Sequence, residues 1–204
     1  MDAFAQIWVV DFEFVARPGE RPEPVCLVAY ELHGGRQIKL WRHEFGPMPP
    51  YGIGADSLFV AFYASAELGC HRALGWPAPA RILDLFTEFR VLTNGGPTVA
   101  GSNLLGALIH FGLDGIAPAQ KDSMRDLVLR GGPWDSEERS AILAYCETDV
   151  VALTKLLSAM APQIDLPRAL LRGRYMAAVA AFSMSSAGAP LRVVSLGRLK
   201  GSAA

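Results

Sequence analysis

The sequence is poor in cysteine and has no long apolar run, the features that mark disulfide-rich, zinc-binding and membrane proteins. It contains only three cysteines, with neither a CxxC pair nor a histidine nearby at zinc-ligand spacing. We therefore expect Cys26, Cys70 and Cys146 to be reduced thiols in or near the core. The longest apolar run, around residues 176–182, is far too short to span a bilayer. No membrane association is expected.

An excess of charge of either sign is also missing. The 19 Lys and Arg residues nearly balance the 20 Asp and Glu residues, for a formal net charge of −1. Tight nonspecific binding to nucleic acid normally needs an excess of basic residues, so this balance counts mildly against a nucleic-acid partner. It does not exclude one, because bound metal ions would offset clustered carboxylates. The first residues carry no basic region, and the apolar stretch from Ile7 to Val10 ends at Asp11, so we expect no signal peptide and a cytoplasmic protein.

The chain has 204 residues, 51% of them hydrophobic, which is enough for a full globular core. Its pattern predicts an α/β fold that opens with an antiparallel meander, in which residues 33–35 form a tight turn. Further strand and helix signals follow, and Ser65 is the expected N-cap of the first helix. Predicted strands cover 7–14, 25–31, 36–42, 58–64 and 81–84, and predicted helices cover 65–74, 86–92, 103–111, 124–130, 136–160 and 169–182.

Two acidic residues stand in the first predicted strand. Residues two apart in a strand point to the same face, so Asp11 and Glu13 project together from an apolar segment. Repulsion and desolvation make such a pair costly unless a cation is close. The pair therefore indicates a metal site. Alternatively, the two acids lie at a frayed strand end in water, or they pair with Arg17 or Arg21.

The long helix predicted over residues 136–160 carries a third acid in an unusual place. Asp149 lies within its apolar stripe, and Tyr145 is stacked one turn before it. A buried carboxylate should meet a cation or a hydrogen-bond donor. Asp149 is thus either a metal ligand or a residue that fixes the helix by pairing with a buried basic or hydroxyl group.

The two elements together resemble the signature of the DEDD exonucleases, in their tyrosine-bearing subclass. The segment 9–13 followed by Tyr145-xxx-Asp149 carries the resemblance, which runs from about residue 7 to residue 157. It implies a ribonuclease-H-like fold, a mixed sheet with antiparallel first strands flanked by helices. It also implies 3′-to-5′ exonuclease activity, like that of the proofreading domain of bacterial family A DNA polymerases.

The middle motif departs from the family pattern of Asn-x-x-Phe/Tyr-Asp. Alignment of residues 62–68 puts Tyr63 in place of the asparagine and Glu67 in place of the aspartate. Glu67 can still ligate a metal, although it is also an ordinary first-turn acid that the helix dipole would favour. Asp84, which ends the fifth predicted strand, is the second choice for this fourth acid.

The resemblance also implies a mechanism and a partner. Asp11, Glu13 and Asp149 would hold one ion, and Asp11 with Glu67 would hold a second, both Mg²⁺ or Mn²⁺. Tyr145 would position the attacking water. The substrate would be a single-stranded or frayed 3′ end of DNA, or alternatively of RNA, and aromatic residues near the motifs, among them Phe62 and Tyr63, could stack a terminal base.

The chain divides by this pattern into an exonuclease domain over residues 1–165 and a C-terminal helix and tail over residues 166–204. The second part resembles the link into the polymerase domain of family A polymerases, although Arg192 stands where those proteins carry an aspartate. No polymerase motif follows, so no polymerase activity is expected.

Overall fold

A mixed sheet of five strands, in the order β3-β2-β1-β4-β5, lies at the centre of the protein. The computed structural model describes residues 1, 3–16, 20–114 and 118–183. β1 pairs antiparallel with β2, and β2 with β3, whereas β1–β4 and β4–β5 are parallel. The α/β class and the opening antiparallel meander are therefore confirmed. The strands are β1 (Gln6–Val15), β2 (Glu23–Glu31), β3 (Gln37–Trp41), β4 (Ser57–Ala61) and β5 (Ile82–Asp84).

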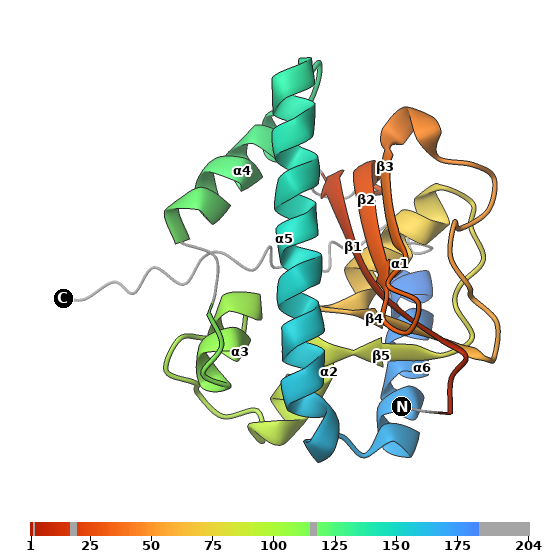
Figure 1. Ribbon diagram of the computed structural model, residues 1–204, viewed down its shortest axis with the longest axis vertical. Helices are drawn as coiled ribbons and strands as arrows, with labels where there is room; N and C mark the ends of the chain where they lie inside the picture. Colours follow the sequence, from red (N-terminus) through yellow and green to blue (C-terminus); the bar gives the residue numbers. More distant parts are fainter. Residues whose placement is uncertain (2, 17–19, 115–117, 184–204) are drawn as a thin grey trace.

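Helices cover both faces of this sheet. The longest helix, α5, runs across one face, and α1 and α6 lie on the other (Figure 1). The described part of the chain has no helix long and apolar enough to cross a membrane. The helices are α1 (Ala64–Ala73), α2 (Leu85–Leu92), α3 (Leu104–His110), α4 (Pro118–Arg130), α5 (Ser136–Met160) and α6 (Leu166–Ser183), with short 3₁₀ turns at Arg42–Glu44 and Ala161–Gln163.

The alternation of side chains along β1 divides the core in two. Ile7 and Val9 pack with the buried face of α5, whereas Trp8, Val10 and Phe12 pack with α1 and the loop around Trp76. All five are buried. The strand therefore presents its odd-numbered residues to α5, the side on which Asp11 and Glu13 must also project.

Two helices begin earlier than their apolar pattern predicts. α4 begins at Pro118 rather than at residue 124, and α6 begins at Leu166 rather than at residue 169. Pro167 lies in the first turn of α6, where a missing N–H costs nothing. A capping box begins α5, because Asp135 and Glu138 exchange side-chain and backbone hydrogen bonds.

The predicted N-cap of α1 is wrong. Ser65 lies inside the helix, and the cap position belongs to Tyr63, whose side chain makes no capping hydrogen bond. Tyr63 has φ 69° and ψ 57°, the left-handed conformation that bulky residues rarely adopt. Two residues connect β4 to α1, and the chain changes direction within them through the left-handed backbone of Tyr63.

α6 is held closely against the rest of the fold. A Cβ atom at Gly173 would overlap the carbonyl oxygen of Ile82 in β5, so the helix backbone lies directly on that strand. The guanidinium of Arg172 donates to both carboxylate oxygens of Glu88 in α2, at 2.7 and 2.6 Å. The predicted tail beyond Ser183, which resembles the link into a polymerase domain, lies outside the described residues.

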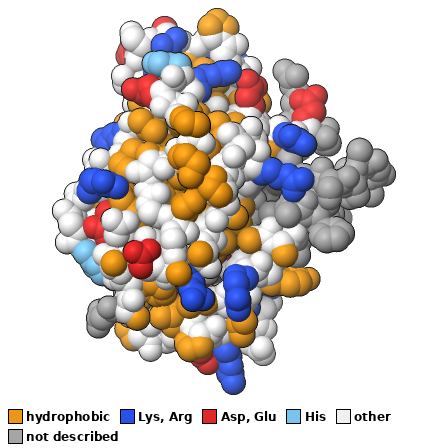
Figure 2. Space-filling model, turned by 90° about the vertical axis from the view of Figure 1, so that its right-hand side faces the viewer, with side chains coloured by type: hydrophobic (Ala, Val, Ile, Leu, Met, Phe, Trp, Pro, Cys, Tyr) orange, Lys and Arg blue, Asp and Glu red, His pale blue; other side chains and the backbone are white. Residues whose placement is uncertain are grey.

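The surface on the right of Figure 1 is mixed in character. Figure 2 shows hydrophobic side chains gathered near the centre of this face, with basic and acidic side chains scattered around them. On the described part of this face neither sign of charge forms a continuous patch. This agrees with the nearly balanced charge of the whole chain.

Candidate metal centre

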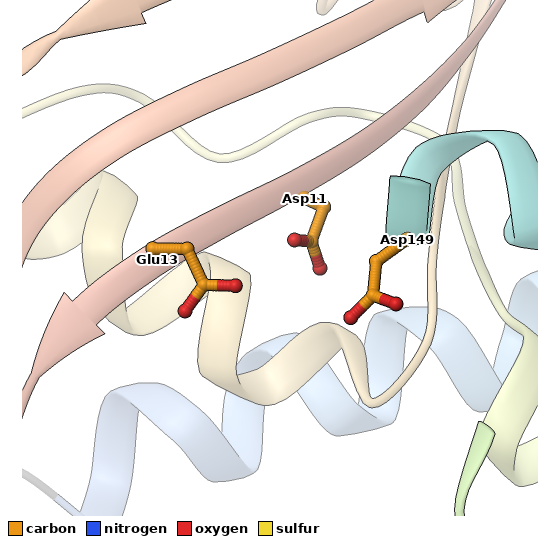
Figure 3. A group of neighbouring side chains, drawn as sticks. All are labelled: Asp11, Glu13 and Asp149. Carbon is orange, nitrogen blue, oxygen red and sulfur yellow. The ribbon is translucent and has the colours of Figure 1, made fainter. Parts of the chain in front are cut away.

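Three carboxylates meet between β1 and α5. One oxygen each of Asp11, Glu13 and Asp149 lies within 4.8 Å of the other two. Asp11 and Glu13 project from the strand and Asp149 projects toward them from the helix (Figure 3). The structure thus brings together three of the acids that the sequence singled out, from segments more than 130 residues apart.

Local structure explains why the acids can meet here. β1 pairs with β4 only as far as Val9, and its register with β2 shifts between Glu13 and Phe14. The strand therefore extends beyond its parallel neighbour, so the edge of β1 next to Asp11 and Glu13 is not paired with β4. Asp11 and Glu13 are partly accessible, whereas Asp149 is only 8% exposed because α5 packs its apolar stripe on the sheet.

The electrostatics of this cluster are unfavourable without a cation. Burial, followed by the charge of Asp11, raises the pKa of Glu13 well above its usual value, and the charges of Asp149 and Glu67 add to the effect. Of the arginines considered from sequence, Arg21 is exposed and Arg17 lies outside the described residues. Carboxylates crowded together in this way are typical of sites that bind a positive ion.

Tyr145 accompanies Asp149 on α5. Burial raises the pKa of the Tyr145 phenol first, and the charge of Asp149 and a hydrogen bond with that carboxylate raise it further. The phenol is half-buried and stays protonated throughout the neutral range. It can therefore act as a hydrogen-bond donor at the rim of the cluster.

Glu67 lies beside the cluster but holds a different contact. Its Oε2 accepts a hydrogen bond of 2.9 Å from the backbone N–H of Phe12, at the edge of β1 that does not pair with β4. Burial and the charge of Asp11 raise the pKa of Glu67, and the Phe12 N–H opposes them. Within the described chain, the group of oxygens closer than 4.8 Å to one another comprises the other three acids alone.

Asp84, the second choice for the fourth acid, is occupied by backbone and hydroxyl donors. Its Oδ1 accepts from the N–H groups of Tyr63 (3.0 Å), Phe86 (3.0 Å) and Thr87 (3.3 Å), and its Oδ2 accepts from the Thr87 hydroxyl at 3.0 Å. Asp84 is the N-cap of α2. These bonds give it a structural role and favour Glu67 as the fourth acid.

The contact between Cys146 and Asp11 was not predicted from the sequence. The thiol of Cys146 lies 3.3 Å from Oδ2 of Asp11 and also 3.3 Å from its carbonyl oxygen, so it donates a weak hydrogen bond to β1. All three cysteines are buried free thiols, as predicted. The only available signal was the position of Cys146 one turn before Val150 and three residues before Asp149, on the buried side of the helix.

Comparisons with known proteins show the fold. No family model and no curated protein matches the chain. The apo form of a nuclease superimposes with a TM-score of 0.66 at 13% identity, over 95% of this chain and 93% of that one. RNase D of Escherichia coli, an exoribonuclease involved in structured RNA processing, superimposes with a TM-score of 0.55 at 16% identity. The chain has the ribonuclease-H-like exonuclease fold.

The same fold recurs in larger proteins. This chain covers 45% of RNase D with 87% of its own length. The family B DNA polymerase of the archaeon Pyrobaculum calidifontis matches with a TM-score of 0.50 at 14% identity, over 86% of this chain and 27% of the polymerase. The ribonuclease-H-like fold is thus established here, and the link to family A polymerases stays a prediction.

Proposed function

We propose that the protein is a metal-dependent 3′-to-5′ exonuclease that shortens DNA and releases nucleoside 5′-monophosphates. The observation that carries this proposal is the meeting of Asp11, Glu13 and Asp149 between β1 and α5 of a ribonuclease-H-like fold. The proposal makes these acids, with Glu67 and Tyr145, the catalytic residues.

The donor set fits hard divalent cations. Carboxylate oxygens from two separate segments are the ligands that Mg²⁺ and Mn²⁺ prefer, and no sulfur or imidazole is needed. Asp11, Glu13 and Asp149 would hold one ion, and Asp11 with Glu67 would hold the second. Two such ions, when bound, activate an attacking water and stabilise the departing 3′ oxygen of a phosphodiester.

The protein's own groups would do the positioning. The Tyr145 hydroxyl, held by Asp149 and kept protonated by its raised pKa, would orient the attacking water toward the terminal phosphate. The bond from Phe12 N–H anchors the Glu67 carboxylate to β1 next to Asp11. The charges of Asp11 and Asp149, which add to burial in raising the pKa of Glu67, support its place among the ligands.

Labelled oligonucleotides test the proposal directly. Single-stranded DNA and RNA of the same sequence, labelled at the 5′ end, are incubated with Mg²⁺ or Mn²⁺. We expect DNA to be shortened from its 3′ end with release of mononucleotides, and chelation by EDTA to stop the reaction. Faster shortening of RNA would favour the alternative, an exoribonuclease of the same class.

A further alternative is an exonuclease fold retained as a weakly active nucleic-acid-binding module, because Glu67 departs from the family's aspartate. Calorimetric titration with Mn²⁺ separates this case, since an active centre should bind two ions and Asp11→Ala should remove that binding. Should neither polymer be shortened, and Glu67→Asp fail to restore activity, the enzyme proposal would be wrong.

A further inference from the structure

Cys146 is buried where α5 packs on the strand that carries two of the acids. Its side chain is fully buried, and its thiol lies 3.3 Å from Oδ2 of Asp11 and 3.3 Å from the carbonyl oxygen of the same residue. A thiol has one proton to donate and is a weak donor. The two acceptors lie at the same distance and belong to one residue, so the proton can be shared between them.

The surroundings of Cys146 keep its thiol neutral. Cys26 on β2 is the partner of Glu13 in the strand pairing, is fully buried, and hydrogen-bonds with Cys146. Burial raises the pKa of the Cys146 thiol well above its usual value, and the contact with Cys26 and the charge of Asp11 add to this effect. The thiol therefore stays protonated at neutral pH and meets the Asp11 carboxylate as a donor, not as a competing anion.

Asp11 is the acid whose orientation matters most for the proposed centre, because the proposed function assigns it to both ions and each of the other acids to one. Oxygens of Glu13 and Asp149 lie within 4.8 Å of an Asp11 oxygen, and their repulsion favours rotation of its carboxylate away from the cluster. A neutral donor on Oδ2 opposes this rotation and adds no charge that would repel a metal. Groups that orient a metal ligand in this way are typically worth about 10- to 100-fold in metal affinity or activity.

We propose that Cys146 is a positioning residue of the metal centre, whose thiol holds Oδ2 of Asp11 so that the carboxylate stays turned toward both ions. This inference rests on the proposed function. The orientation of Asp11 is set before an ion arrives, so metal binding does not have to order this side chain. Helix α5 then serves the centre with three side chains, since Asp149 binds metal, Tyr145 orients the water and Cys146 orients Asp11.

Substitutions of Cys146 with and without a donor test the inference in the full-length chain. Cys146→Ala removes the thiol, whereas Cys146→Ser keeps a donor at the same place. In calorimetric titrations we expect Cys146→Ala to raise the Kd for Mn²⁺ about 10- to 100-fold, and Cys146→Ser to stay within about threefold of the wild type. If Cys146→Ala does not fold, Cys146→Val fills the space without a donor and should show the same rise.

Cys70 provides the matched control. It is also a fully buried free thiol on a helix, but it packs in the cluster on the α1 side of the sheet. Cys70→Ala removes the same atoms from the core and should leave the Kd for Mn²⁺ unchanged. An equal rise in Kd in Cys146→Ala and Cys70→Ala would assign the effect to lost packing and overturn the inference. Equal losses of Mn²⁺ affinity in Cys146→Ser and Cys146→Ala would also overturn it.

The metal dependence of the rate separates positioning from packing. On single-stranded DNA, the Mn²⁺ concentration that gives half the maximal rate should rise about 10- to 100-fold in Cys146→Ala, and saturating Mn²⁺ should restore the rate. A loss of rate that Mn²⁺ does not restore would contradict the positioning role.

The same measurements distinguish this inference from the proposed function. If the wild type binds Mn²⁺ more tightly than Cys146→Ala but shortens no DNA, the exonuclease proposal fails and the positioning stands. If DNA is shortened and the Mn²⁺ dependence of Cys146→Ala equals that of the wild type, the positioning alone is wrong. A wild type that binds no Mn²⁺ would overturn both.

Discussion

Both sides of the central sheet bury ionisable groups, around His71 on the α1 side and around Asp149 on the α5 side. On the α1 side both ring nitrogens of His71 are hydrogen-bonded. Nδ1 donates to the Pro77 carbonyl (3.0 Å), and Nε2 accepts from the Tyr51 hydroxyl (2.5 Å). On the α5 side, Asp149 meets Asp11 and Glu13, and burial together with the charges of the other two acids raises the pKa of Glu13.

This difference separates polar groups that serve the fold from those that serve a function. A buried group whose hydrogen bonds are complete costs little and specifies one arrangement of the core. Crowded carboxylates destabilise the protein unless something positive binds. The acidic cluster on the α5 side could therefore bind a positive ion, whereas the groups around His71 on the α1 side have their partners within the protein.

Neutralising a single carboxylate of the acidic cluster should abolish most of the exonuclease activity. We expect Asp149→Asn to lower kcat/KM on single-stranded DNA by about 1000-fold or more, because a catalytic metal contributes several kcal/mol to transition-state stabilisation. Glu137→Gln, at an exposed position on the same helix, is the matched control and should leave the rate unchanged. Comparable activity of Asp149→Asn and wild type would remove Asp149 from the metal centre.

The same side should also respond to pH when metal is absent. Burial among other acids raises the pKa of Glu13, so the folded state binds more protons than the unfolded state between the unfolded and folded values. The stability of the EDTA-treated protein should therefore fall as pH rises through that window, and Mg²⁺ should reverse the fall. Urea titrations of wild type and Glu13→Gln check this, since the variant should show a flatter dependence.

The hydrogen-bonded side should respond to pH in the opposite direction. Burial lowers the pKa of His71 to about 4, from 6.5 in the unfolded chain, so the unfolded state binds more protons between these values. Stability should be lost as pH falls from 6.5 through 4, by about 3 kcal/mol in total. Unfolding free energies of wild type and His71→Gln at pH 7 and pH 4 measure this term. An equal loss in both proteins would show that His71 does not cause it.

Asp84 and Glu147 are carboxylates that already accept hydrogen bonds from other groups of the protein. Asp84→Ala should cost about 1–2 kcal/mol through the lost cap of α2, while Mn²⁺ binding persists. Glu147 lies two residues from Asp149 but accepts from Lys39 (2.6 Å) and Gln37 (2.8 Å) at the surface. Glu147→Gln should cost less than about 1 kcal/mol, with no effect on metal binding. Loss of Mn²⁺ binding in either variant would contradict the division between the two kinds of acid.

Much of this site could be anticipated from local sequence. The period of two along β1 puts Asp11 and Glu13 on one face, and the helical period of α5 puts Asp149 in its buried stripe. The same periods predicted the meander and the long helix. They failed at Ser65 and at the start of α6, because helix ends depend on how neighbouring segments meet and not on local propensity alone.

The faces and elements that carry the acids could be predicted from the sequence alone. The different contacts of Asp84 and Glu67 could not, because both acids border apolar residues. Asp84 caps a helix and Glu67 accepts from the Phe12 N–H beside the cluster, and such hydrogen-bond partners depend on how distant segments pack. The left-handed turn at Tyr63 was equally hidden. A two-residue connection between a strand and a helix has no periodicity, so its conformation follows from the packing of the elements it joins.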